Sequence, residues 1–194
     1  MPVVMFDRVT NDILCDKVII DDQSAAYEAV QSLIDKGRKK IALVTTVDYV
    51  SVGKLRTDGY IKALLDNGIS FDENLIIKIE DIDTCEITIG KLLEDKAIDA
   101  VFAVNELFAV TIIKTANKIG LNVPKDLAVI AFTDGMISKY STPTITTVSQ
   151  NGIKMGNKSA KMLIERLESE ENEEDENYKT EIIETHLIER ESTN

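Results

Sequence analysis

At 194 residues, the chain is long enough to bury a hydrophobic core, and its length suggests one domain or one and a half. A hydrophobic content of 44% is ordinary for a globular protein, and no apolar run approaches the roughly 20 residues of a membrane-spanning helix. Lys and Arg number 22 against 34 Asp and Glu, a net charge of −12, and so acidic a surface repels nucleic-acid phosphates. We therefore expect no membrane partner and no nucleic-acid binding by this chain itself.

The first half of the chain alternates between predicted strands and helices. Short apolar strands at 2–6 and 18–20 precede a helix with one apolar face, which begins near Asp22 and ends at Gly37. The pattern continues with a strand at 41–45, a helix ending at Gly68, a strand at 75–79 and a helix at 86–93. Alternation of this kind with short turns predicts a doubly wound α/β fold with a parallel sheet.

Residues 99–134 predict a complete strand–helix–strand unit. The apolar runs 100–104 and 127–132 are continuous, which is typical of parallel strands buried on both faces. Apolar residues recur at helical intervals between them. In parallel sheets ligands bind beyond the carboxyl ends of the strands, and these two runs end at Asn105 and Asp134. The unit therefore predicts a binding site at that edge.

The last part of the chain departs from this alternation. Residues 136–148 are irregular, and a helix with an apolar stripe follows at 152–168. The acidic run 168–176 has the composition of a solvated linker, and a last strand is expected over 182–188. We infer that the chain visits a second lobe and returns to the first.

The sequence contains few motifs that would indicate catalysis, a cofactor or a metal. His186 is the only histidine and lies in the last predicted strand, where an edge or core position is expected rather than catalysis. The turn after strand 41–45 lacks the G-x-G-x-x-G pattern of dinucleotide sites. Cys15 and Cys85 fit no metal or redox spacing, which predicts two buried free thiols. We expect a binding protein without a cofactor or metal rather than an enzyme.

Five polar residues at predicted strand ends and turns are the candidate ligand-binding set: Asp7, Arg56, Asn105, Thr133 and Asp134. Carboxylates, an arginine fork and a carboxamide suit a hydroxyl-rich or heterocyclic ligand, because they offer paired donors and acceptors. Each residue also has a structural alternative. Asp7 would cap a turn, Arg56 would form a surface ion pair, and Asn105 would cap its own helix.

Several ordered motifs resemble one known family: PVVMFDR from Pro2, SLIDKGRKKIALVT from Ser32, LRTDGYIKALLDNGI from Leu55, FAVNELFAV from Phe102, GLNVPKDLAVIAF from Gly120, TTVSQNGIKMG from Thr146 and HLIERES from His186. The chain resembles the effector-binding core of LacI/GalR-type transcription regulators, which share the fold of type I periplasmic sugar-binding proteins. The resemblance implies that Asp7, Arg56 and Asn105 line an effector pocket. Thr133 replaces an acidic residue that usually contacts the ligand, and Glu106 replaces the usual Asp.

The resemblance also implies a division of the chain. Residues 1–20 would be a remnant of the N-terminal sublobe and a crossover, and 21–148 the nearly complete C-terminal sublobe. Residues 149–170 would form a helix returning to the N-terminal sublobe, 171–180 an acidic linker, and 181–194 the final strand of the C-terminal sublobe with its tail. Most of the N-terminal sublobe, the hinge and the helix-turn-helix domain would be absent, so a fragment or truncation is expected.

The function implied is that of a cytoplasmic regulator that senses a sugar or sugar-like effector. Effector binding would shift an equilibrium between open and closed forms, and operator DNA would be bound only through the absent domain. A homodimer is expected through the helix 105–119 and the strand 75–79. A periplasmic-type solute-binding module is the alternative. A flavodoxin-like enzyme is a third, for which the sequence offers no convincing base or nucleophile.

Overall fold

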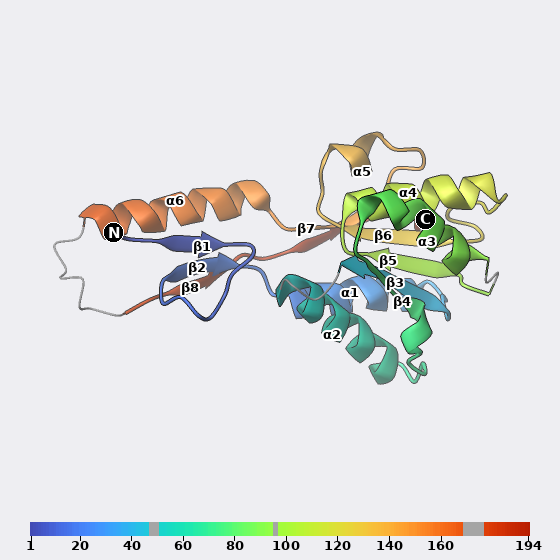
Figure 1. Ribbon diagram of the computed structural model, residues 1–194, viewed down its shortest axis with the longest axis horizontal. Coiled ribbons are helices and arrows are strands. Elements are labelled where there is room, and N and C mark those ends of the chain that lie inside the picture. Colours follow the sequence, from blue (N-terminus) through green and yellow to red (C-terminus); the bar gives the residue numbers. More distant parts are fainter. Residues whose placement is uncertain (47–50, 95–96, 169–176) are drawn as a thin grey trace. The chain divides into compact units, whose positions relative to one another are not determined.

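The computed structural model describes residues 1–46, 51–94, 97–168 and 177–194. The chain forms two compact units. Unit 1 comprises residues 1–21 and 150–185, and unit 2 comprises residues 22–149 and 186–194. Each unit has its own sheet, and unit 2 contains most of the helices (Figure 1).

Unit 2 is built on a six-stranded sheet in the order β4-β3-β5-β6-β7-β9. The first five strands are parallel, and β9 pairs antiparallel to β7. The central strands are buried along their whole length because their side chains are apolar on both faces. The strands are β3 (Ile41–Thr46), β4 (Ile76–Ile79), β5 (Ala100–Ala103), β6 (Ala128–Phe132), β7 (Thr146–Ser149) and β9 (His186–Ile188).

Helices cover both faces of this sheet, so the predicted doubly wound α/β fold is confirmed. Helices α1 (Asp22–Asp35) and α2 (Ser51–Asp66) lie on one face, and α3 (Cys85–Leu93) and α4 (Glu106–Lys118) lie on the other (Figure 1). The short helix α5 (Met136–Tyr140) follows β6 and contacts α4. Two single-turn helices, η1 (Glu73–Leu75) and η2 (Ile82–Thr84), flank β4.

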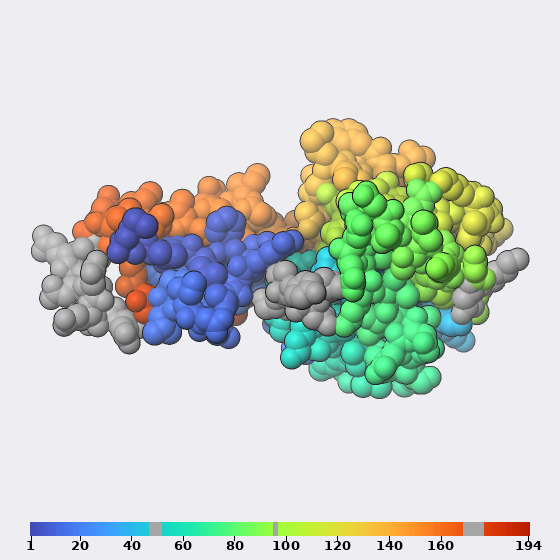
Figure 2. All heavy atoms as spheres, in the orientation of Figure 1, coloured from blue at the N-terminus to red at the C-terminus, as the bar shows by residue number. Residues whose placement is uncertain are grey.

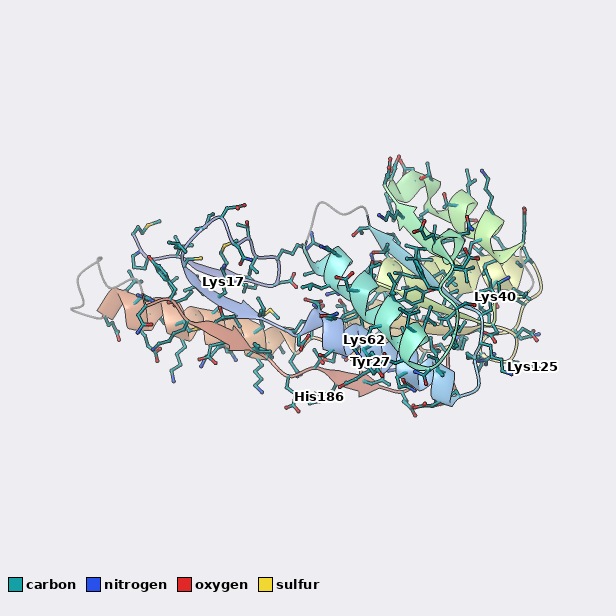
Figure 3. The ribbon with its side chains drawn as sticks, turned by 90° about the horizontal axis from the view of Figure 1, so that it is seen from below. Lys17, Tyr27, Lys40, Lys62, Lys125 and His186 are labelled. Atoms are coloured by element: carbon teal, nitrogen blue, oxygen red, sulfur yellow. The ribbon has the colours of Figure 1, made fainter. Side chains whose placement is uncertain are left out.

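The α1–α2 contact depends on a glycine. A Cβ atom on Gly59 would lie 2.3 Å from the backbone oxygen of Gln23, so only glycine allows the two helices to approach this closely. On the outer surface of the same helix pair, the Lys62 ammonium lies 4.5 Å from the ring centre of Tyr27 (Figure 3). Inside, the Tyr60 hydroxyl donates a hydrogen bond to the Ile41 carbonyl, which ties α2 to β3.

Unit 1 has a three-stranded parallel sheet of β1 (Val4–Phe6), β2 (Asp16–Ile19) and β8 (Thr180–Ile182), in the order β1-β2-β8. Helix α6 (Gly152–Glu168) packs along β1 and β2. Two hydrogen bonds from Arg166 on α6 reach the buried carboxylate of Asp16 on β2, at 2.6 and 3.0 Å. The backbone N–H of Lys179 donates to the same carboxylate, so Asp16 joins three segments of unit 1.

The end of the chain corrects one expectation. Instead of one strand over 182–188, the structure has β8 in the sheet of unit 1 and β9 in the sheet of unit 2. The backbone N–H of Ile183 donates to the carbonyl of Ile19, so residue 183 still belongs with β2, and the pairing with β7 starts only at His186. His186 is exposed on the edge strand (Figure 3). The acidic run 169–176 lies outside the described residues.

Both cysteines are buried and free, as predicted. In the part of the chain that the structure describes, no helix has the length and apolar character needed to cross a membrane.

Candidate functional site

The strand order of unit 2 creates a switch point between β3 and β5. The chain moves outward from β3 to β4 and then returns past β3 to form β5, so the two connections leave on opposite faces of the sheet. In doubly wound sheets, the carboxyl ends of the strands at such a point are the usual ligand site. Here Thr46, Asn105 and Thr133 follow or end β3, β5 and β6 at this edge.

Arg56 lies inside this edge rather than on the surface. Its Nε donates to Asp22 Oδ1 at 2.7 Å, and its Nη1 donates to the Val104 carbonyl at 2.9 Å. Its guanidinium carbon lies 3.7 Å from the centre of the Phe132 ring. The Arg56 and Asp22 side chains are only 8% and 4% exposed. The predicted surface ion pair is therefore a buried one, and it joins α2 to α1, β5 and β6.

Asn105 caps α4, as its structural alternative predicted. Its Oδ1 accepts a hydrogen bond from the backbone N–H of Phe108 at 2.8 Å. Among the described residues, none accepts a hydrogen bond from the Asn105 amide nitrogen. Capping fixes the side chain by its oxygen and leaves its N–H groups for a ligand, so the two roles are compatible.

Asp134 is bound by three donors of unit 2. Arg190 Nη2 donates to Oδ1, Thr147 Oγ1 donates to the same oxygen at 3.1 Å, and Lys139 Nζ lies 3.1 Å from Oδ2. Burial raises the pKa of this carboxyl, but the hydrogen bonds from Arg190 and Lys139 outweigh burial and leave the pKa below its ordinary value. Asp134 is thus an ionised anchor for the end of the chain.

Thr133 combines exposure with an unusual backbone. Its φ of 75° lies in the left-handed region, which is costly for a β-branched residue. Its backbone N–H donates to the Val148 carbonyl at 2.9 Å, so pairing with β7 holds this conformation. The side chain is exposed at the carboxyl end of β6.

Glu106 has a role that the sequence did not reveal. Its Oε1 accepts hydrogen bonds from the backbone N–H groups of Gly135 and Ser138, at 2.7 and 2.9 Å. These bonds attach the loop after β6 and the start of α5 to the start of α4. A Cβ atom on residue 135 would lie 2.3 Å from Glu106 Oε2, so a side chain here would force the Glu106 carboxylate to move.

A hollow of about 580 Å³ opens at this edge of the sheet, and we call it the strand-end hollow. Side chains from the ends of β3 and β4, from η2 and α4, and from α5 line it. They are Thr46, Ile79, Glu80, Ile82, Asn105, Glu106, Leu107, Phe108 and Ile137. Most of its wall is therefore apolar, with the Asn105 amide among its few polar groups.

Asp7 belongs to unit 1. Its backbone has a φ of 61°, and its carboxylate accepts a hydrogen bond from Gln150 Nε2 at 3.4 Å and lies 3.9 Å from Arg8 Nε.

Of the five candidate residues, the structure brings Arg56, Asn105, Thr133 and Asp134 to one edge of one sheet. Sequence reasoning missed Asp22 and Arg190, the ionic partners of Arg56 and Asp134, because they lie 34 and 56 residues away along the chain.

Metal-binding groups are not evident in the described ranges, where no three His, Cys, Asp or Glu side chains are suitably grouped. The charged candidates Arg56 and Asp134 form ion pairs with Asp22 and Arg190 instead.

The matching family model, a periplasmic binding protein-like domain, covers residues 30–193. The transcriptional regulator MalR of Clostridium butyricum is 39% identical over 177 residues, which are 89% of this chain and 51% of MalR. The regulator CelR of Thermobifida fusca is 31% identical over 177 residues, 90% of this chain and 51% of CelR. The chain thus spans about half the length of the curated relatives that it matches.

Solved structures of regulators have the same fold. A complex of CelR with cellobiose superposes with a TM-score of 0.87 at 30% identity, covering 97% of this chain and 58% of that one. A LacI family regulator from Enterococcus faecium with bound ribose gives a TM-score of 0.89 at 26% identity, covering 99% and 70%. With the match to the family model, these likenesses confirm the resemblance read from the motifs. The chain therefore belongs to the periplasmic binding protein-like domains, among relatives that are LacI-type transcriptional regulators.

Proposed function

We propose that this chain is the effector-binding part of a LacI-type transcriptional regulator and that its effector is a sugar or sugar-like molecule. The observation that carries the proposal is the convergence of Arg56, Asn105 and Thr133 on the carboxyl edge of one parallel sheet, where Asn105 also lines the strand-end hollow. That edge is where ligands bind in such folds, and the volume of the hollow is in the range of small-molecule sites. Relatives of the same fold hold cellobiose and ribose.

The proposed effector acts on transcription and undergoes no reaction. This chain has a net charge of −12 and is poorly suited to bind phosphates. In the proposal, a separate DNA-binding domain therefore binds operator DNA, and the regulator acts in the cytoplasm. Effector binding shifts the population of two conformations, and that shift is passed to the DNA-binding domain. The charged groups at the site are held by one another, an arrangement suited to orienting a ligand rather than to proton transfer.

Calorimetric titration with maltose, cellobiose and ribose tests the sensing function. We expect saturable binding of at least one sugar and at least about tenfold weaker binding in Asn105→Asp, because aspartate keeps the helix cap but loses the amide donors. Asn117→Asp makes the same chemical change at an exposed position later in α4 and is the matched control. Equal affinity in Asn105→Asp and the wild type would remove Asn105 from the site. Absence of binding to any sugar in a wider panel would refute the proposal.

We also propose that unit 2 forms a homodimer through the face of α3 and α4. The apolar breadth of α4 only partly supports this, because Phe108, Ile112 and Ile113 are buried within unit 2. Better support comes from exposed apolar side chains outside the hollow: Ile87 on α3 and Ile119 at the end of α4 are 64% and 51% exposed. Helices α3 and α4, coloured green to yellow-green, form much of the face of unit 2 turned to the viewer in Figure 2.

Light scattering over a range of concentrations tests the dimer. Ile87→Lys is expected to weaken association at least about tenfold, because it places a charge in an apolar contact. Leu65→Lys makes a comparable change on the exposed side of α2 and is the control. A monomeric mass for the wild type at high concentration would refute the dimer and leave the sensing function untouched.

A further inference from the structure

The two largely buried arginines at the carboxyl edge of unit 2, Arg56 and Arg190, already have carboxylate partners. Arg56 pairs with Asp22 at 2.7 Å, and both side chains are less than one tenth exposed. A buried ion pair is stable only while both partners are present, since either charge alone is poorly solvated. A ligand that drew Arg56 away would leave the Asp22 carboxylate buried and uncompensated. The positive charge of Arg56 is therefore not free to balance a negative ligand.

A second group, two cations around one carboxylate, is likewise held together within unit 2. Asp134 accepts from Arg190, whose Nη1 also donates to the Ile145 carbonyl and to Thr147 Oγ1, at 2.7 and 2.9 Å. Lys139 lies 3.1 Å from the other carboxylate oxygen. Arg190 and Asp134 are only 16% and 13% exposed. These contacts fix Arg190 in a structural role at the start of β7.

Among the residues that the structure describes, none that lines the strand-end hollow is cationic. Its two charged lining residues are Glu80 and Glu106, and both are acidic. Glu106 is engaged by two backbone N–H groups, and Glu80 is exposed at the end of β4. A negative ligand entering the hollow would meet two carboxylates and no counter-charge on a largely apolar wall.

We infer that the effector of this site is uncharged, a neutral sugar or polyol, and that sugar phosphates and sugar acids are rejected. The inference rests on the proposed sensing function and narrows its ligand class. Discrimination comes from like-charge repulsion and from the lack of a cation among the described residues of the wall, so it acts against every anionic analogue of a sugar that fits. Asn105 supplies hydrogen-bond donors to hydroxyl oxygens without adding charge.

Matched neutral and anionic ligands provide the test. Calorimetry on the full chain would compare maltose with maltose 6′-phosphate, cellobiose with cellobionate, and ribose with ribose 5-phosphate. For the pair whose neutral member binds, the anionic member should bind more than about tenfold more weakly. Glu80→Lys should reduce this ratio several-fold, because it places a cation in the wall of the hollow. Glu28→Lys changes the net charge equally on the exposed side of α1, outside the hollow, and should leave the ratio unchanged.

These outcomes distinguish a failure of the inference about charge from a failure of the proposed sensing function. Equal or tighter binding of the anionic member would overturn the inference while supporting a sensor of sugar acids or phosphates. An equal effect of Glu28→Lys and Glu80→Lys would also overturn it, because the discrimination would then come from overall charge. If no member of any pair binds, the proposed function fails and the inference falls with it.

Discussion

The buried pair of Arg56 and Asp22 allows a quantitative prediction about folding. Truncating Arg56 to Met removes its hydrogen bonds to Asp22 and to the Val104 carbonyl, together with its contact over the Phe132 ring. Most of the cost comes from the buried Asp22 carboxylate that is left without a partner, and breaking such pairs typically costs about 3–5 kcal/mol. Loss of the ring contact adds up to about 2 kcal/mol for a desolvated cation. We therefore expect Arg56→Met to lower the free energy of unfolding by about 3–7 kcal/mol, the sum of these two contributions.

A double-mutant cycle separates the ionic term from packing. Asp22→Asn keeps an acceptor oxygen at the start of α1 but leaves the arginine charge buried and uncompensated, so it too should destabilise. The loss of unfolding free energy in the double variant should be smaller than the sum of the two single losses, by about 2 kcal/mol or more. The reason is that neither charge is then left buried alone. Urea unfolding followed by far-ultraviolet circular dichroism measures all four free energies.

An exposed ion pair on α2 serves as the control for this cycle. Lys62 and Asp66 lie 2.5 Å apart with half-exposed side chains, and a cycle on that pair should show a far smaller coupling because solvent screens it. Additive costs at Arg56 and Asp22, within about 0.5 kcal/mol, would refute the reasoning that the buried pair acts as a unit. A loss below about 1 kcal/mol for Arg56→Met would refute the assigned magnitude.

Three further substitutions probe other contacts. Gly59→Ala should lower the free energy of unfolding, measured by urea denaturation, by about 1–3 kcal/mol, because its Cβ would meet the backbone of α1. Its control is Gly90→Ala on α3, where a Cβ would lie in open space and should not destabilise the fold. At Asp16, burial raises the pKa, but hydrogen bonding to Arg166 and Lys179 lowers it overall. The ionised form therefore stabilises unit 1 above the ordinary pKa of about 4, and that stabilisation is lost as the pH falls through the lower folded pKa. Asp16→Asn should abolish this acid dependence of unfolding. Gly135→Ala should speed hydrogen exchange at the start of α5, because its Cβ would displace the Glu106 carboxylate.

The sequence was most informative about the sheet of unit 2. The runs 100–104 and 127–132 correspond to β5 (Ala100–Ala103) and β6 (Ala128–Phe132) because strands buried on both faces must be apolar throughout. The closing strand was harder to predict. Residues 182–188 form one strand-like run in the sequence, but its first half pairs with β2 and its second half with β7. Local pattern does not determine which sheet a strand joins.

In the candidate site, too, local sequence pattern predicted some residues but not the contacts between residues far apart in the chain. Strand ends identified Asn105 and Asp134, because the end of an apolar run is visible in the sequence. The partners of charged residues were not visible: Asp22 carries the local pattern of a helix start, and nothing nearby connects it with Arg56. The left-handed backbone of Thr133 was also unpredictable, since no local pattern favours φ above zero for threonine.

These contacts decide which residues can report on binding without reporting on folding. An arginine in a surface ion pair could be removed without loss of folding, but the buried partner of Arg56 argues against that here. A weaker affinity in an Arg56 variant would therefore combine lost ligand contacts with lost structure. Asn105 is separable, because its oxygen serves the fold by capping α4 while its nitrogen remains for the ligand. The change from amide to carboxylate keeps the capping oxygen and removes only the N–H donors. Asn105→Asp is therefore the variant on which the assignment of this site should be judged.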